Sequence, residues 1–174
     1  VFRAAQVEQA IRSGVLYPRW APEFYYGNGY PIFNYYAPLA YHLAAYFSLV
    51  SGLGVVAGTK FVLLLSAYLG ACGMYLFVRN RWGPAEAVVG GVAWSFSPYI
   101  IFLEPHARGE VAETLAIGIS PLLFWSFDCV RRNGWGNHVP AAALTLAALV
   151  FAHPLTALVA YGFLLAFLFW EFLI

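Results

Sequence analysis

The segment Glu104-Pro-His-Ala-Arg-Gly-Glu-Val-Ala-Glu113 carries four charges and one histidine in ten residues, and it lies between two apolar runs, residues 87–103 and 114–127. The whole chain is 62% hydrophobic and only 10% charged, whereas about a quarter of the residues of a soluble domain are charged. Apolar runs of this kind predict transmembrane helices. Ionisable groups are costly to keep beside such helices, so this acidic segment indicates a function.

The apolar runs of the chain predict an all-α fold, a polytopic transmembrane helix bundle that occupies residues 39–174. Spans are expected near residues 60–78, 85–103, 112–130, 138–152 and 155–173. His153 and Pro154 divide the last two, because proline interrupts a helix. Residues 39–53 give about 15 apolar positions, fewer than the roughly 20 that a span needs, so they predict an interfacial or re-entrant helix.

Residues 1–38 form a separate region, for which we expect a place at the outer face of the membrane. Residues 1–14 repeat with a helical period, with Arg3, Gln6 and Glu8 on the polar face, and predict an amphipathic juxtamembrane helix. Residues 15–38 contain four prolines and two glycines, which exclude a regular helix. This segment is an aromatic-rich outer loop, whose rings either lie at the headgroup level or stack on sugars.

Basic residues set the orientation of the predicted bundle. Two basic pairs, separated by two spans, fall on the cytoplasmic side by the positive-inside rule: Arg79 with Arg81, and Arg131 with Arg132. The acidic segment then lies outside. Asp128 and Glu171 lie near inner ends of helices, where we expect them to be paired or to extend towards the interface.

Several classes of function are excluded by composition and motif. The formal net charge of +1 argues against nucleic acid as a partner, because phosphate contacts need clustered Lys and Arg. Cys72 and Cys129 lie far apart in apolar runs and suggest neither a metal site nor a disulfide framework. The chain also lacks the glycine-rich phosphate loop and the common hydrolase motifs.

Two stretches of the outer loop resemble a known family: Tyr17-Pro18-Arg19-Trp20, and Gly29-Tyr30-Pro31-Ile32-Phe33-Asn34-Tyr35-Tyr36-Ala37-Pro38-Leu39. They are similar to the 6-pyruvoyl-tetrahydropterin-synthase-related membrane proteins of bacteria, which resemble a branch of the C-type glycosyltransferase superfamily. The resemblance continues through Arg108 and Glu113 to His153. It implies a multi-spanning enzyme of the bacterial cytoplasmic membrane that uses a polyprenyl-phosphate sugar as donor, with its active site on the outer face.

The same resemblance implies that part of the enzyme lies upstream of Val1. In that superfamily an essential acidic residue follows the first transmembrane helix, and this chain resembles the sequence that begins just after it. No Asp occurs in residues 1–36. We therefore expect an N-terminally truncated fragment that lacks the usual catalytic base.

The resemblance and the charges together give a set of site residues. Arg19, Lys60 and Arg108 are expected to bind the donor phosphate, since Arg and Lys neutralise phosphate charge. Glu113, with Glu110 second, is expected to act on the acceptor or to bind a metal. Residues expected to line the substrates are Trp20, Tyr30, Tyr36, His106 and His153. No cofactor is certain, and a divalent cation stays an open alternative.

Two other functions remain open at this point. The chain could be a non-catalytic structural or accessory subunit of a larger membrane complex, in which the same charges pair with one another as a structural clasp. A transporter would place charges near the middle of the membrane in paired broken helices. Because the acidic segment lies at a predicted helix end, the transporter is disfavoured. The partners expected in every case are the lipid bilayer and, for the enzyme, the polyprenyl-linked sugar.

Overall fold

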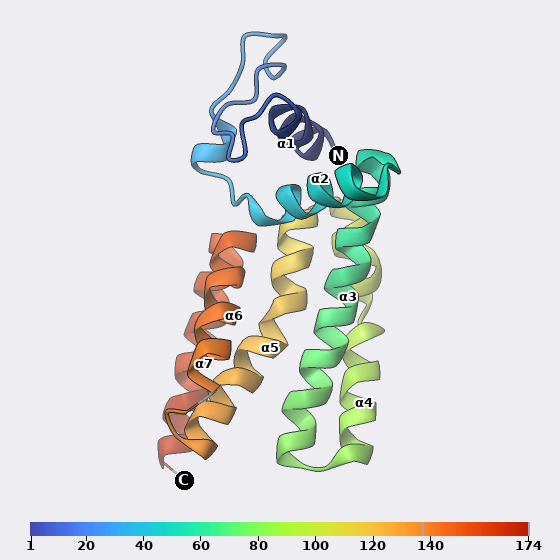
Figure 1. The fold of residues 1–174 in the computed structure, drawn as a ribbon. Helices are drawn as coiled ribbons and strands as arrows, with labels where there is room; N and C mark the ends of the chain where they lie inside the picture. The colour runs from blue at the N-terminus through green and yellow to red at the C-terminus, as the bar shows by residue number, and fades with distance from the viewer. Residues whose placement is uncertain (137, 174) are drawn as a thin grey trace. The chain divides into compact units, whose positions relative to one another are not determined.

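The structure is a computed structural model that describes residues 1–136 and 138–173, and its regular elements are helices (Figure 1). Across these residues no β-strand occurs, and one isolated bridge joins Ala21 to Tyr30. The predicted all-α class is confirmed. The elements in chain order are α1 (Phe2–Arg12), η1 (Ile32–Asn34), α2 (Leu39–Ser51), α3 (Gly54–Arg81), α4 (Pro84–Ser95), η2 (Tyr99–Arg108), α5 (Val111–Asn133), α6 (His138–Ala152) and α7 (Pro154–Leu173).

The chain divides into two compact units, an N-terminal unit of Val1–Leu64 and a C-terminal unit of Leu65–Ile174. Helix α3 begins in the first unit and continues into the second. The division after residue 38 that the sequence suggests concerns placement at the membrane, and it stays a prediction.

Four helical stretches are long and apolar enough to cross a membrane: α3, α4 together with η2 (Pro84–Arg108, with a short break at Phe96 and Ser97), α5 and α7. The shortest of them, α7, has 20 residues, or about 30 Å of helix. Helix α2 has 13 residues and α6 has 15, so each is shorter than the roughly 20 residues of a full span. An interfacial or re-entrant α2 and a spanning α6 both remain predictions.

The N-terminal unit is built on the packing of α1 against α2. Ala4 and Val7 are buried, as the helical period predicts. Gln6, expected on the polar face, is buried too, because its side chain donates to Glu23 Oε2 at 2.8 Å and accepts from the Glu23 N–H at 3.1 Å. Paired hydrogen bonds of this kind remove the cost of burying an amide. They tie α1 to the proline-rich loop, in which no α-helix forms between residues 15 and 38.

The C-terminal unit is held together by small residues at helix crossings. A β-carbon on Gly118 of α5 would lie 2.3 Å from the Ser66 carbonyl oxygen of α3, and one on Gly70 would lie 2.4 Å from the Trp94 indole nitrogen of α4. Backbones approach this closely in membrane proteins where glycine or alanine lines the contact. Helices α6 and α7 pack against α5 and against each other, on the side of α5 that faces away from α3 (Figure 1). Pro154 starts α7, which confirms that His153 and Pro154 divide the last apolar run.

Candidate functional site

The acidic segment of the sequence folds into the end of one helix and the start of the next. Its first five residues complete the π-helix η2, and Val111 begins α5. Between them Gly109 has a φ of 68°, the left-handed region that glycine adopts at little cost, and its N–H donates to the Glu104 carbonyl oxygen at 3.0 Å. This turn brings side chains of η2 to the first turn of α5. Stretches of π-helix are frequent at functional sites.

Arg108 is the centre of the contacts in this segment. Its Nη1 donates to Glu104 Oε2 at 2.7 Å, and its Nη2 lies 3.1 Å from Glu113 Oε2. Nη1 also donates to the Tyr99 hydroxyl at 3.0 Å. We call these residues the Arg108 cluster: Tyr99, Glu104, Arg108 and Glu113. The two residues that the sequence places together, Arg108 and Glu113, are therefore in direct contact.

Exposure rises steadily across the Arg108 cluster. The Glu104 side chain is 0% exposed, Glu113 is 19% exposed and Arg108 is 44% exposed. Oε1 of Glu104 is buried and accepts no hydrogen bond from any described residue. A buried carboxylate needs a partner, so Glu104 fixes the guanidinium in place. Glu113 lies in the first turn of α5, where the helix dipole favours negative charge, and it is the carboxylate that a ligand can reach.

The guanidinium of Arg108 keeps hydrogen-bonding capacity beyond these contacts. Arginine has five N–H donors, and the hydrogen bonds of Arg108 to described residues all come from Nη1 and Nη2. Its Nε–H donates to none of the described residues. With all groups ionised, two carboxylates face one guanidinium and the cluster has a net charge of −1. It can therefore hold an anion only beside its exposed donors, while Glu113 can accept a proton from a neighbouring hydroxyl.

A second group of charges lies at the opposite end of α5. Arg131 and Arg132 of α5 lie 3.0 Å and 2.9 Å from the Asp128 carboxylate, whose side chain is 0% exposed. Arg81 of α3 lies 3.5 Å from the same carboxylate and is also paired with Glu171 of α7. We call these residues the Asp128 cluster: Arg81, Asp128, Arg131, Arg132 and Glu171. The prediction that Asp128 and Glu171 are paired is confirmed, since both carboxylates are paired with arginines.

Three other predicted site residues belong to the C-terminal unit but have different contacts. Glu110 precedes the first turn of α5, and its carbonyl oxygen accepts from the Thr114 hydroxyl at 2.9 Å. His106 is exposed on η2, with its ring centroid 6.2 Å from that of Phe102. His153 Nδ1 lies 2.8 Å from the Thr156 hydroxyl in the first turn of α7. A capping role of this kind accounts for His153 locally, and its place among the substrate-lining residues stays a prediction.

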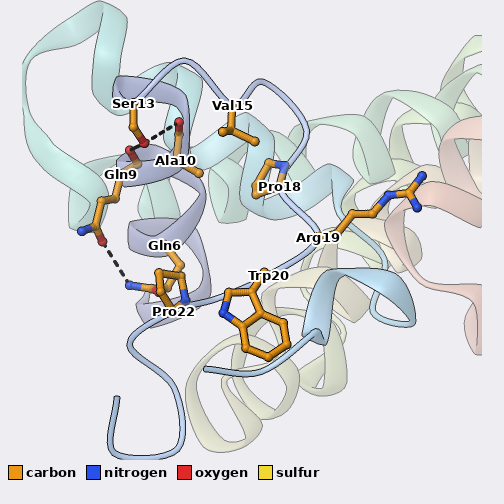
Figure 2. Close-up of a pocket in the computed structure, with 9 residues that line it drawn as sticks. All are labelled: Gln6, Gln9, Ala10, Ser13, Val15, Pro18, Arg19, Trp20 and Pro22. Carbon is orange, nitrogen blue, oxygen red and sulfur yellow. Dashed lines mark hydrogen bonds between the residues drawn. The ribbon is translucent and has the colours of Figure 1, made fainter. Parts of the chain in front are cut away.

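Arg19 and Trp20 line a pocket of about 290 Å³ within the N-terminal unit (Figure 2). Trp20 is 51% exposed, and Arg19 is exposed as well. Figure 2 shows the Arg19 guanidinium pointing away from the other labelled side chains, so Arg19 lines the pocket with its stem. The remaining lining residues are Gln6, Gln9, Ala10, Ser13, Val15, Pro18 and Pro22.

The two stretches of the loop that carry the family resemblance meet in space. The Ala21 N–H donates to the Tyr30 carbonyl at 2.9 Å, and the Tyr30 N–H returns to the Ala21 carbonyl at 3.0 Å. Gly29, with a φ of 79°, lies against the Trp20 ring, where a β-carbon would come within 2.4 Å of it. Only glycine satisfies both demands. The bridge therefore holds the two stretches side by side.

Tyr36 and Lys60, also in the N-terminal unit, differ in their surroundings. The Arg3 guanidinium lies 4.0 Å from the centroid of the Tyr36 ring, and it donates to the Tyr41 hydroxyl at 2.8 Å. This cation–π contact gives Tyr36 a packing role in the unit. Lys60 is exposed on α3. The convergence of Arg19 and Lys60 with Arg108 stays a prediction.

Sequence reasoning missed two members of the Arg108 cluster as site residues. Glu104 was part of the quoted segment and lies four positions before Arg108, the spacing of an ion pair on a helix, but this signal was not used. Tyr99 lies inside an apolar run and gave no signal. The widened turn of η2 brings its hydroxyl to a residue nine positions away, which the period of an α-helix does not predict.

Metal binding was left open by the sequence. Within residues 1–136 and 138–173, no three His, Cys, Asp or Glu side chains are arranged to hold a metal ion. The two carboxylates of the Arg108 cluster are instead oriented towards a guanidinium.

Comparison with known families gives one match. Residues 33–173 match the family described as the 6-pyruvoyl-tetrahydropterin synthase related domain, a membrane protein family. The match contains the whole Arg108 cluster, Lys60 and Tyr36, whereas Arg19, Trp20 and Tyr30 precede it. No match was found among curated proteins or among solved structures.

Proposed function

We propose that this chain, which belongs to the 6-pyruvoyl-tetrahydropterin synthase related family of membrane proteins, is part of a glycosyltransferase that takes a sugar from a polyprenyl-phosphate donor. The observation that carries the proposal is the direct contact between a half-exposed Arg108 and the accessible Glu113 at a helix end, at 3.1 Å. A guanidinium and a carboxylate held this close supply the two groups that such a transfer needs.

The proposed reaction uses these groups in defined roles. The bond between the sugar C1 and the phosphate oxygen breaks, and a new bond forms between C1 and the oxygen of an acceptor hydroxyl. The free donors of Arg108, with Arg19 and Lys60 as further candidates, neutralise the departing polyprenyl phosphate. Glu113 takes the acceptor proton, and Glu110 is the second candidate for that role. We place the reaction on the outer face of a bacterial cytoplasmic membrane.

The geometry of Glu104 assigns it a positioning role in this proposal. It is completely buried and lies 2.7 Å from Arg108 on the side away from solvent. It therefore holds the guanidinium in one orientation without reaching a substrate. Arginine positioned in this way binds phosphate with less loss of side-chain entropy.

One observation favours the second candidate, a structural or accessory subunit. Both terminal nitrogens of Arg108 already contact carboxylates of the same chain, Glu104 and Glu113. These contacts join η2 to α5 and would hold the two helices together without any reaction. The two functions predict different results for Glu113→Gln: the enzyme loses sugar transfer, whereas a structural subunit has no sugar transfer to lose.

The test is transfer of a labelled sugar from polyprenyl phosphate by the full-length protein in lipid nanodiscs. Wild type is compared with Arg108→Ala and Glu113→Gln, and Glu171→Gln in the Asp128 cluster is the control. The enzyme requires that turnover falls about 100-fold or more in both site variants while the control keeps it. Full turnover in both site variants, or none in any form across several donors, favours the accessory subunit.

A further inference from the structure

An open groove of about 560 Å³ runs between α3 and α4 within the C-terminal unit. Its lining is almost wholly apolar, with aromatic side chains along both helices and small residues between them. The aromatic members are Tyr68, Tyr75 and Phe96. It lies outside the Arg108 cluster, and its lining includes none of the residues that we assign to the proposed reaction.

The groove exists because the two helices come very close at residues that lack bulk. A β-carbon on Gly91 of α4 would lie 3.2 Å from the Ala71 carbonyl oxygen of α3 and 3.6 Å from Tyr75 Cβ. Backbone and small side chains therefore form the floor, and no side chain fills the space above it. The larger residues on either side leave an open furrow.

Hydrocarbon is the medium that meets this groove in a membrane. Both α3 and the combined α4–η2 stretch are long and apolar enough to span, and only 11% of the apolar window of α4–η2 is buried inside the protein. The groove-facing residue Val92 is 52% exposed. The hydrocarbon core holds no water, so a lipid chain or another apolar surface must cover the furrow.

The position of the groove relates its occupant to the Arg108 cluster. Phe96 lines the groove where α4 ends, and after a short break in the helix at Phe96 and Ser97 the chain enters η2 at Tyr99. The Tyr99 hydroxyl accepts a hydrogen bond from Arg108 at 3.0 Å. A lipid whose chain leaves the groove at Phe96 would thus present its headgroup next to a half-exposed guanidinium. That position suits an anionic phosphate head.

We propose that the groove between α3 and α4 binds the isoprenoid chain of the polyprenyl-phosphate donor. The identity of the headgroup rests on the proposed function, whereas the location of the chain rests on the groove. One furrow takes one chain, which suits a single-chain lipid better than a two-chain phospholipid. The branched, unsaturated isoprenoid packs its methyl groups against the faces of Tyr68, Tyr75 and Phe96.

The experiment uses a polyprenyl phosphate without sugar that carries a photoreactive group on its chain. The full-length protein in nanodiscs is cross-linked, and labelled peptides are mapped. We expect labelling within residues 68–96, competed by unlabelled polyprenyl phosphate and not by phosphatidylglycerol. Labelling elsewhere, or equal competition by phosphatidylglycerol, would overturn the proposal.

Binding of polyprenyl phosphate by matched variants on α4 gives a second test. Val88 and Val92 line the groove and are 56% and 52% exposed, whereas Val89 is 69% exposed and does not line it. Val88→Trp and Val92→Trp fill the furrow and should weaken binding of polyprenyl phosphate about tenfold or more. Val89→Trp should leave it unchanged. Equal binding in all three variants, each with an unchanged melting temperature, contradicts the proposal.

These readouts separate this inference from the proposed function. Specific labelling of the groove without any sugar transfer supports a lipid-binding protein and removes the enzyme. Sugar transfer with labelling outside the groove keeps the enzyme and removes this site.

Discussion

The two ends of α5 carry two charged clusters that are built in opposite ways. In the Asp128 cluster three guanidinium groups surround two carboxylates, and Asp128 is completely buried between them. In the Arg108 cluster one guanidinium is shared by two carboxylates, and the buried carboxylate, Glu104, is paired within its own helix. With all groups ionised, the net charge is +1 in the first and −1 in the second.

This difference shows how a charge cluster near a membrane can be read. A buried charge contacted from several helices is a structural junction, because removing any member leaves another charge uncompensated. The Arg108 cluster instead joins two consecutive segments of the chain, η2 and α5, and under the proposed function the free donors of Arg108 bind the donor phosphate. The Asp128 cluster joins α3, α5 and α7, and its arginines are those that the positive-inside rule assigns to the cytoplasmic side.

The largest loss of stability is expected from Asp128→Ala. Loss of this carboxylate leaves Arg81, Arg131 and Arg132 close together without their shared partner, at a cost of about 3–5 kcal/mol. The thermal unfolding midpoint in detergent should fall by roughly 10 °C. An unchanged midpoint would mean that the Asp128 cluster does not hold the helices together.

Arg108→Gln should lower the free energy of unfolding by less, about 2–3 kcal/mol, because Arg108 is half exposed. Its removal leaves one buried charge, Glu104, without a cationic partner. Adding Glu104→Gln should recover most of that stability, since the buried charge is then gone. Sugar transfer should be lost in both the single and the double variant. If the double variant recovers transfer together with stability, the guanidinium has only a structural role.

Glycines near the two ends of α5 allow a matched test. Replacing either one by alanine should lower the free energy of unfolding by about 1–2 kcal/mol. Gly109 has a φ of 68° and Gly134 a φ of 79°, and a β-carbon at either would meet nothing within 4 Å. Alanine at either position is strained by its backbone conformation alone. Both variants should lower the unfolding midpoint, and only Gly109→Ala should also lower turnover. Equal loss of turnover in both would remove the distinction between the ends.

A pair outside both clusters gives the smallest effect. Burial opposes ionisation of Glu8, but polar contacts from Ser48 and the Arg12 guanidinium outweigh it and hold the pKa of Glu8 below its ordinary value of 4.5. Because the pKa is lower in the folded state, Glu8 stabilises the protein above pH 4.5, and this contribution is lost as the pH falls through the lowered pKa.

Glu8→Gln should therefore cost about 0.3–0.5 kcal/mol at neutral pH, since Arg12 is largely exposed. The difference from wild type should vanish once the pH is well below the lowered pKa of Glu8. Unfolding midpoints measured across this pH range check the sign. A difference that grows in acid would contradict it.

The sequence predicted those features that depend on local pattern. Apolar length gave the four long helices, and proline gave the break at Pro154. The family resemblance and the charges of residues 104–113 together brought Arg108 and Glu113 forward as site residues, and the two side chains are in contact.

Features that depend on tertiary contacts were not predictable. Gln6 lies on the polar side by helical period, yet it is buried because it makes two hydrogen bonds to Glu23 of the loop. Tyr99 enters the Arg108 cluster only because η2 is π-helical. Arg81 contacts Asp128 and Glu171, which lie 47 and 90 positions further along the chain. The positive-inside rule placed these charges on one side of the membrane, but which residues pair with which is set by how the helices pack.

The measurement that tests the central claim most directly compares Glu113→Gln with Glu171→Gln in the full-length protein. The two glutamates are 19% and 17% exposed, and each is paired with arginine, so the substitutions are closely matched. We predict that Glu113→Gln loses sugar transfer with little change in melting temperature, and that Glu171→Gln lowers the melting temperature while each folded molecule keeps its turnover. Equal turnover in the two variants would contradict the account and leave both clusters as structural junctions.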